Sequence, residues 1–536
     1  MDILHCTTTP FIVIILLFIY IIHHYSSKKL SKNLPPSPPS LPFIGHLHLL
    51  KSPRNLSIHS LSQQYGPVVA LRLGSRNAII LSSPAAVEEA LIKNDTIFSN
   101  HPVIKAGHIL GYNNTTMFFS PYSPHWRNLR RLTSLQLLST SRINLLTGIR
   151  TQEFLSLIRR MVKDSSSGKI DIQAKFFEMT YNLMSKMVVG KRYYGESLDV
   201  EVEVANQFKD IMKEEIQLMF SFNPRDFFPA LGWMDLLGVE RRMERLLPKV
   251  DRFLADIVEE ARRKRRNDRA NGGEEAEKET KEEEKSLVDV MLSMQETDPE
   301  TFTDEVIKGN IKTMLMAGTD TLALTIEKMM LFLLSHPETL KKTKEEIDTN
   351  VGHERIINES DLPKLPYLNN ILKETLRLTL ADFPPRESSG DCTIQDYHVP
   401  KGTMLFVNAL GINRDPELWD DAMSFKPERF DREEEEKVFK YMPFGAGRRK
   451  CPGEHLAMRM VMAGVGALVQ CFEWEPMSKE EVDINSPLGL IVSNGKPVVA
   501  KYQCINKWPH IYKTLKPVPK NSIKSNRNIN FKSKEF

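Results

Sequence analysis

The chain contains few cysteines, and their spacing is irregular. There are five, an odd number, and no two of them form a CxxC pair. A disulfide framework or a structural zinc site needs paired or regularly spaced cysteines, so neither is predicted. The five residues are Cys6, Cys392, Cys451, Cys471 and Cys504.

The chain also lacks a basic field that would attract nucleic acid. Its formal net charge is +4, but residues 501–536 alone contribute nine basic residues against one acidic residue. Residues 1–500 therefore carry a net charge of −4. A nucleic-acid-binding function is not indicated. The fractions of apolar residues, 41%, and charged residues, 26%, are those of a globular protein.

One long hydrophobic run is present, at the N-terminus. Residues 11–22 read "FIVIILLFIYII", preceded by Asp2 and followed by three lysines, Lys28, Lys29 and Lys32. This order of charge predicts an uncleaved transmembrane signal anchor over residues 1–24, with everything after it in the cytosol. A buried core helix is the alternative.

The rest of the chain divides into segments that differ in composition and hydrophobic periodicity. Residues 25–45 are basic and proline-rich, which favours an extended linker. Residues 66–83 read as a β-hairpin, residues 84 to about 380 follow helical periodicity, and short strands are expected from about 390. No boundary interrupts residues 46–500, so they are predicted to form one domain, mainly α with a smaller β-rich part. The basic tail, residues 501–536, is predicted to be disordered.

Two interruptions of the helical region carry separate expectations. Residues 262–285 form a basic run followed by an acidic run, which favours a solvated loop. In residues 220–238 aromatic side chains cluster around prolines and glycines. These aromatics are expected either to be exposed, at a membrane surface or an apolar ligand entrance, or to belong to the core.

The stretch "FGAGRRKCPG", residues 444–453, carries the strongest chemical signal. Cys451 follows three basic residues and precedes a helix start, and both features favour a thiolate. A thiolate is a suitable ligand for a soft metal centre. The alternative, a structural cysteine, leaves the glycines and the charge unexplained.

This stretch resembles the haem-binding signature of the cytochromes P450. Phe444, Arg449 and Cys451 stand at the positions of that signature, with glycines between them. The resemblance extends over residues 35 to about 500 and implies the P450 fold, an anchor in the endoplasmic reticulum and a haem whose iron is bound by Cys451.

Further motifs follow the order of that family. "ETLR" contains Glu374 and Arg377, which lie on one helix face, and "PERF" contains Arg429. In the family these three form a buried charge network beside the haem. "AGTDT" resembles the oxygen-activating segment, in which Asp320 and Thr321 would relay protons. Gly318 in this segment is expected to leave room beside the helix backbone.

Arginine can hold the haem propionates through its forked donors. The resemblance assigns this role to Trp126 and Arg130 of "WRNLRR", to Arg449, and to Arg386 of "PPRESS". The other two basic residues of the cysteine stretch, Arg448 and Lys450, would favour the thiolate or face a reductase.

The resemblance is to plant microsomal P450s that hydroxylate flavonoids, isoflavonoids, lignans and terpenoids. It implies a haem b monooxygenase that receives electrons from NADPH through a reductase and oxidises a small apolar substrate. A P450-type isomerase or dehydratase that needs no external oxygen, and a haem-binding protein without turnover, are the alternatives.

Two departures from the family pattern, Leu322 after the "AGTDT" threonine and a short segment at 378–388, change the surroundings of the site. The substrate pocket is expected from residues 103–119, from Phe220 and Phe222, from Met314 and Ala317, and from residues 488–493.

Overall fold

The computed structural model describes most of the chain in separate stretches. They are residues 15, 18–19, 33–51, 54–164, 168–195, 202–231, 235–279, 285–379, 383–431, 439–476 and 499–505. Within these stretches no helix is both long enough and apolar enough to cross a membrane. The predicted anchor, residues 1–24, lies almost entirely outside them.

Helices account for most of the described residues, as predicted. The longer ones are α2 (Arg54–Tyr65), α5 (Pro124–Gln136), α7 (Thr147–Asp164), α8 (Ile172–Val189), α9 (Val202–Met219), α10 (Val239–Glu279), α11 (Leu287–Thr297), α12 (Asp304–Ser335), α13 (Pro337–Asn350), α14 (Pro366–Thr379) and α16 (Glu454–Cys471). The short ones are α3 (Pro84–Glu88), α4 (Lys105–Ile109), α6 (Thr140–Leu145) and α15 (Ala409–Asn413). Single turns are η1 (Leu47–Leu49), η2 (Glu89–Lys93), η4 (Pro224–Asp226), η5 (Pro229–Leu231), η7 (Glu359–Lys364) and η8 (Pro427–Asp431).

The strands of the described residues form three small sheets. One has the order β1 (Val68–Leu73), β2 (Arg76–Leu81), β7 (Met404–Val407) and β4 (Arg386–Glu387). The second has the order β3 (Lys169–Asp171), β9 (Val499–Cys504) and β8 (Phe472–Trp474), and the third pairs β5 (Cys392–Ile394) with β6 (Tyr397–Val399). The predicted hairpin is confirmed, since β1 and β2 are antiparallel and Leu73 pairs with Arg76 across the turn.

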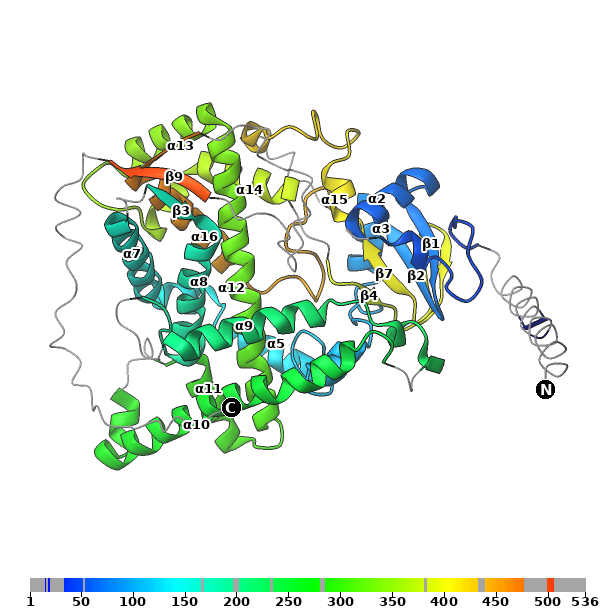
Figure 1. Ribbon diagram of the computed structural model, residues 1–536, viewed down its shortest axis with the longest axis horizontal. Helices are drawn as coiled ribbons and strands as arrows, with labels where there is room; N and C mark the ends of the chain where they lie inside the picture. The colour runs from blue at the N-terminus through cyan, green and yellow to red at the C-terminus, as the bar shows by residue number, and fades with distance from the viewer. Residues whose placement is uncertain are drawn as a thin grey trace, which may run out of the picture.

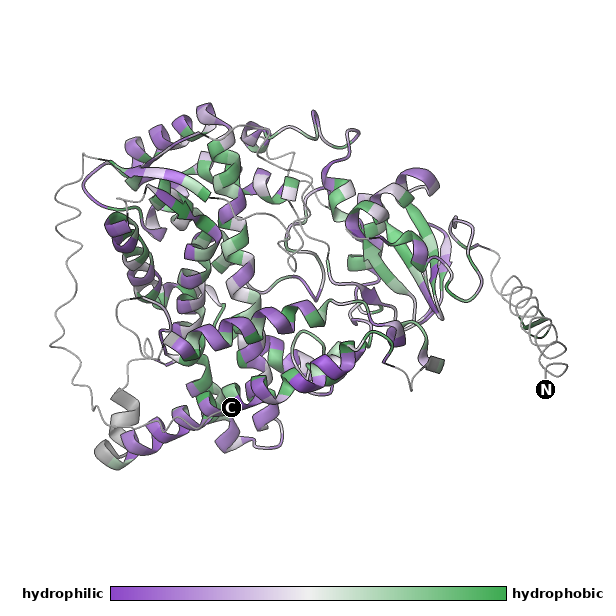
Figure 2. Cartoon of the chain, viewed as in Figure 1, coloured by the Kyte–Doolittle hydropathy of each residue, from purple (hydrophilic) through white to green (hydrophobic). Residues whose placement is uncertain are grey.

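Figure 1 shows a large helical body with the four-stranded sheet at one side. The long helix α12 runs through the body and packs against α8, α10, α14 and α16. In Figure 2 hydrophobic residues gather on the strands of the sheet and inside the helical body, whereas α10 and α13 are mostly hydrophilic. Helix α12 therefore forms the central wall against which other elements are placed.

The loop predicted at 262–285 is wrong over most of its length. Residues 262–279 continue α10 to Glu279. Lys, Arg, Glu and Ala are good helix formers, so charge alone does not break a helix. Arg262 pairs with Glu259 one turn earlier and with Asp304 at the start of α12, and these ion pairs give the charged face partners.

The two ends of the predicted domain also differ from expectation. Residues of the proline-rich linker attach to the sheet, because Ala70 of β1 donates to the Pro36 carbonyl and the His46 ring contacts the Pro38 carbonyl at 2.8 Å. At the other end, β9 continues to Cys504, so the first residues of the predicted disordered tail pair with β3 and β8 instead. The rest of the tail lies outside the described residues.

Candidate haem site

The loop that carries Cys451 is closed by its own backbone and packs against residues 91–95. The Cys451 amide donates to the Phe444 carbonyl at 2.9 Å. Gly447 has a φ of +70°, and a Cβ there would lie 2.4 Å from the Leu91 carbonyl oxygen, so only glycine fits. The Cys451 side chain is accessible and stands just before α16, which begins at Glu454.

Arg448 and Lys450, for which the sequence left two roles open, have separate ion-pair partners in the structure. Arg448 binds Asp95 through its main-chain amide at 2.9 Å and through its side chain at 2.8 Å. Lys450 pairs with Glu454, four residues later, at 2.6 Å. Arg448 therefore fastens the cysteine loop, and Asp95 is a structural partner that no sequence motif indicated.

Desolvation changes the expected ionisation of the cysteine. The Cys451 side chain reaches solvent, but the protein atoms packed around it displace water and raise the pKa of the thiol, and this effect outweighs the Gly453 amide and Arg130, which lower it. The thiolate bias predicted from the basic residues and the helix start is therefore wrong for the free thiol. Bound iron would itself deprotonate the sulfur.

Three arginines gather beside the cysteine loop without a carboxylate between them. In the described part of the chain, the hydrogen bonds of Arg130, Arg386 and Arg449 all go to main-chain carbonyls. Burial and repulsion by Arg386 and Arg130 lower the pKa of Arg449 to about 9. Burial lowers the pKa of Arg386 to about 10, although the nearby Asp95 carboxylate opposes this shift. The buried Nη1 of Arg386 has no hydrogen-bond partner among the described residues.

These observations fit a haem. Uncompensated buried charge is costly, and a bound group with two carboxylates would offset it. The arginines converge on the cysteine loop, since Arg130 donates to the Lys450 carbonyl at 2.6 Å and Arg386 to the Arg449 carbonyl at 3.4 Å. One group that ligates Cys451 and presents two propionates satisfies both requirements.

Trp126 lies beside Arg449 and its ring nitrogen has a main-chain partner, while its bond to a haem propionate stays a prediction. Its ring nitrogen donates to the Met117 carbonyl at 3.1 Å, and the Arg449 guanidinium lies 4.3 Å from its ring centroid. Helix α5 begins at Pro124, two residues before Trp126, and the Ser123 side chain caps it by accepting from the Trp126 amide. Trp126 thus supports Arg449 by a cation–π contact, and a bond to a propionate would require it to give up Met117.

The three residues of the predicted charge network meet in the interior. The side chains of Glu374 and Arg377 are fully buried and joined by two hydrogen bonds, of 2.7 and 2.8 Å. Arg429 donates to the same carboxylate at 3.0 Å. The Trp419 ring covers Arg377, with the guanidinium 5.1 Å from the ring centroid. The predicted pairing of these residues is confirmed.

The segment around Asp320 lies midway along α12. Ala317 is exposed although the helix is mostly buried, and the Thr321 hydroxyl donates to the Ala317 carbonyl at 2.7 Å. The open gap predicted at Gly318 is wrong, because a Cβ there would lie 2.6 Å from the Met184 sulfur of α8. The glycine instead allows α8 to approach α12 closely.

Asp320 is more basic than an ordinary carboxylate. Burial raises its pKa to about 6, and Lys209 and Lys213 of α9 lower it only in part. Asp320 can therefore accept and return a proton near neutral pH.

Leu322, which departs from the family pattern, packs in the hydrophobic core.

The raised pKa of Asp320 predicts a pH-dependent cost to stability. The folded state holds a proton that the unfolded chain loses above its pKa of about 3.8, so stability falls as pH rises from about 4 to 6. Asp320→Asn removes this term, and its gain in Tm over the wild type should be larger at pH 7.5 than at pH 4.5. Asp396→Asn, at an exposed turn residue, should show no such difference. Equal gains at both pH values would contradict the assignment.

Part of the predicted pocket wall forms an aromatic cluster. Phe118 meets Phe119 edge-on with centroids 4.9 Å apart and Phe220 at 6.3 Å, and it stacks on His101 at 5.5 Å. Burial, together with Arg386 and Arg449, holds the pKa of His101 well below its usual value, so this ring is neutral. An aromatic wall thus adjoins the arginine cluster. The other predicted wall, residues 488–493, lies outside the described residues.

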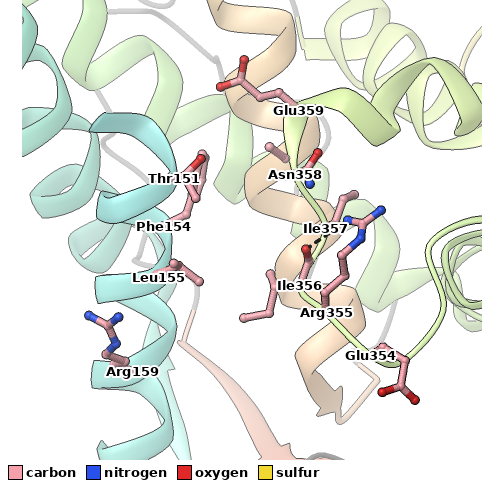
Figure 3. A pocket seen from close by; sticks show the side chains of 11 residues that line it. Thr151, Phe154, Leu155, Arg159, Glu354, Arg355, Ile356, Ile357, Asn358 and Glu359 are labelled. Carbon is pink, nitrogen blue, oxygen red and sulfur yellow. Dashed lines mark hydrogen bonds between the residues drawn. The ribbon is translucent and has the colours of Figure 1, made fainter. Parts of the chain in front are cut away.

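A separate hollow of about 320 Å³ lies between α7, the segment before η7, and α16. Figure 3 shows its walls, with Arg159 on one side and Glu354 on the other. Its lining residues are Thr151, Phe154, Leu155, Arg159, Glu354, Arg355, Ile356, Ile357, Asn358, Glu359 and Ala463. None of the predicted site residues is among them, so this hollow does not belong to the cysteine site.

Comparisons with known proteins agree with this geometry. The family model for cytochrome P450 matches residues 35–501. An isoflavone 3'-hydroxylase of Medicago truncatula is 45% identical over 88% of this chain and 92% of its own length. An isoflavone 2'-hydroxylase of Glycyrrhiza echinata is 42% identical, over 90% and 94%. A (+)-piperitol/(+)-sesamin synthase of Sesamum radiatum is 42% identical, over 87% and 90%.

Solved structures share the same architecture. A zebrafish cytochrome P450 with progesterone superposes with a TM-score of 0.67 at 25% identity, over 85% of this chain and 98% of that chain. Another zebrafish structure, with abiraterone, gives a TM-score of 0.68 at 24% identity, over 84% and 99%.

Proposed function

This chain belongs to the cytochrome P450 family, and we propose that it hydroxylates an aromatic ring of an isoflavonoid or a related phenolic plant metabolite. The observation that carries this proposal is the similarity, over nearly the whole chain, to two isoflavone hydroxylases. The aromatic cluster of His101, Phe118 and Phe220 supports it, because such rings favour flat aromatic ligands.

The chain is a haem-thiolate monooxygenase of specialised metabolism. It uses haem b, receives electrons from NADPH through a reductase partner, and acts on an apolar substrate. When bound, the haem supplies the activation of dioxygen. We assign its iron ligand to Cys451 and its propionate partners to Arg130, Arg386 and Arg449, because these arginines lie at the cysteine loop and make their side-chain hydrogen bonds to main-chain carbonyls in the described part of the chain.

The remaining groups of the site hold and move protons. The Thr321 hydroxyl donates to the Ala317 carbonyl, and it can rotate away from that carbonyl to donate its proton on the side of α12 where Ala317 is exposed. The carboxyl group of Asp320 lies one residue away, and its pKa of about 6 suits proton exchange near neutral pH. Phe118 and Phe220 would exclude water from the bound substrate and orient its rings.

Residues 1–24 are proposed to anchor the enzyme in the endoplasmic reticulum, with the catalytic domain in the cytosol. The apolar run at 11–22 and the lysines after it support this orientation. Exposed hydrophobic side chains in residues 34–44 and at Leu236 and Leu237 provide a surface that suits a lipid interface.

The proposal is tested by expressing the full chain in microsomes with a reductase. Isoflavones, flavones, lignans and diterpenes are supplied with and without NADPH, and products are identified by mass spectrometry. An isoflavone or lignan product that carries one added oxygen is expected. Product formed without NADPH would instead support an isomerase or dehydratase, and a haem spectrum without any product a non-catalytic haem protein.

Thr321→Ala is expected to uncouple electron use from oxidation. Loss of the hydroxyl removes a proton donor from the exposed face of α12. The alanine that replaces Thr321 favours a helix, so the fold should be retained. Product per NADPH should fall by about tenfold or more, with peroxide formed in its place. Thr325→Ala removes a similar hydroxyl, bonded to the Thr321 carbonyl at 2.7 Å, and serves as the matched control. Unchanged coupling in Thr321→Ala would remove the role given to this residue.

A further inference from the structure

The aromatic wall belongs to a segment whose backbone is strained. After α4, three consecutive residues that are not glycine, Tyr112, Asn113 and Asn114, have φ values of 48°, 54° and 60°. Each residue in this left-handed region costs on the order of 1 kcal/mol. Such a run persists only if surrounding contacts hold it.

A buried ion pair supplies one of these contacts. Lys312 of α12 pairs with Glu215 of α9 at 2.6 Å, and their side chains are only 5% and 1% exposed. The same Lys312 ammonium donates to the Leu110 carbonyl, two residues before the strained run, and lies 5.1 Å from the centroid of the Tyr112 ring. Lys312 thus joins two helices to the segment in one place.

A second pair fastens the strained run itself. The Tyr112 hydroxyl donates to Asp251 of α10 at 3.0 Å. Asp251 also pairs with Lys308, one turn before Lys312 on α12, at 2.5 Å. The segment is therefore tied to α9, α10 and α12 through charged groups at Leu110 and Tyr112.

The far end of the segment is held by the haem site. Arg449 donates to the Met117 and Ser120 carbonyls. Between these points, Phe119 packs on Gly107 and Gly111, where a Cβ would lie 2.8 and 2.7 Å from its ring. Phe118 is left to face Phe220. Fixing Leu110 at one end and Met117 at the other therefore sets where Phe118 stands.

Stability alone does not explain the buried pair. Replacing a buried ion pair by apolar side chains is often neutral or stabilising, whereas such pairs can fix one arrangement over others. Burial raises the pKa of Glu215, and its Oε2 has no hydrogen-bond partner among the described residues, so the pair is expensive to keep. A positional role accounts for this cost.

We propose that Lys312 is a positioning residue that, through Glu215 and the Leu110 carbonyl, fixes the 105–119 segment and thereby the shape of the substrate pocket. This inference rests on the proposed placement of the pocket against Phe118, but not on the identity of the substrate. Lys312 itself touches neither the haem site nor Phe118 in the contacts described above.

Two variants of the full-length holoenzyme test the proposal. Lys312→Met removes the donor to Leu110 and leaves Glu215 unpaired. Lys312→Met combined with Glu215→Leu removes both charges, which keeps the interior neutral if the single variant does not fold. Lys501→Met, which breaks an exposed pair with Glu475 at 2.8 Å, is the matched control.

The probes are imidazole, which needs only the iron, and 4-phenylimidazole, whose ring also needs the pocket wall. If only about a tenth of the molecules keep Phe118 and its neighbours in the conformation that binds the phenyl ring, the Kd of 4-phenylimidazole rises about tenfold. The Kd of imidazole and the reduced carbon monoxide spectrum should not change. Amide hydrogen exchange of residues 107–116 should accelerate in the same variants. Lys501→Met should match the wild type in all measurements.

Two results would overturn the proposal. One is an unchanged Kd ratio of the two probes in both variants. The other is wild-type behaviour of the double variant, which would mean that Lys312 only neutralises Glu215. Because neither probe is a natural substrate, a failure here is distinct from a failure to find an isoflavonoid product.

Discussion

The Cys451→Ala variant is expected to lose the thiolate-type absorbance of the reduced carbon monoxide complex, together with all product formation. The sulfur is the one soft ligand in the loop of residues 444–453, and its removal leaves the arginine cluster able to hold propionates but not iron. The haem should therefore bind weakly and in another ligation state.

A second measurement follows from the pKa of this thiol. Because burial raises the pKa of Cys451, the free thiol is protonated near neutral pH, and ligation must release a proton. Haem affinity of the apoprotein should thus increase as pH rises. Cys392→Ser, at a partly buried cysteine of β5, is the matched control and should retain the wild-type spectrum. Wild-type absorbance in Cys451→Ala would refute the ligand assignment.

The parts of the site that lie close together in sequence could be predicted from it. The loop from Phe444 to Gly453 positions its cysteine by local turns and glycines, and Glu374 meets Arg377 one helical turn later. Both arrangements depend on short spacings along the chain, so they can be predicted from the sequence.

Contacts between distant segments could not be predicted in the same way. The partner of Arg448 is Asp95, and the neighbour that fills the space at Gly318 is Met184. Nothing near these residues in sequence indicates the contact, since the fold brings the segments together. The predicted thiolate bias of Cys451 was wrong for the same reason. Desolvation depends on all the atoms around the thiol, and here it outweighs the charges adjacent in sequence.

The sequence around Lys312 contains a signal for a buried ion pair. Lys312 is the one charged residue between Lys308 and Asp320 in an otherwise mostly apolar stretch of α12, and a buried charge in such a stretch needs a partner. Its partner, Glu215, lies on another helix. The sequence therefore indicates that a pair exists, while only the structure identifies it and its bond to Leu110.

Arg377→Met is expected to prevent accumulation of folded holoenzyme. The substitution leaves the Glu374 carboxylate buried with Arg429 as its remaining ion-pair partner among the described residues. It also removes bonds to the carbonyls of Asn413 and Ala422, at 2.6 and 2.7 Å. Breaking a buried pair in this way costs about 3–5 kcal/mol. Yield of the carbon monoxide-binding form and Tm measure the loss.

An exposed pair provides the comparison for this loss. Lys342 and Glu428 are about half exposed and lie 3.0 Å apart. Lys342→Met should therefore cost about 1 kcal/mol or less and leave the yield of holoenzyme unchanged. Equal losses in Arg377→Met and Lys342→Met would mean that burial of the network does not determine its contribution.

Arg377→Lys separates charge from geometry. Lysine keeps the positive charge, but its single ammonium cannot reproduce the side-on fork to both Glu374 oxygens together with the bonds to Asn413 and Ala422. At least two carbonyl or carboxylate oxygens would then be buried without a donor, each costing about 1–3 kcal/mol. We therefore expect Arg377→Lys to lose holoenzyme nearly as severely as Arg377→Met. A Tm within about one degree of the wild type would show that the network needs only a buried cation, and that the forked geometry seen around Glu374 is dispensable.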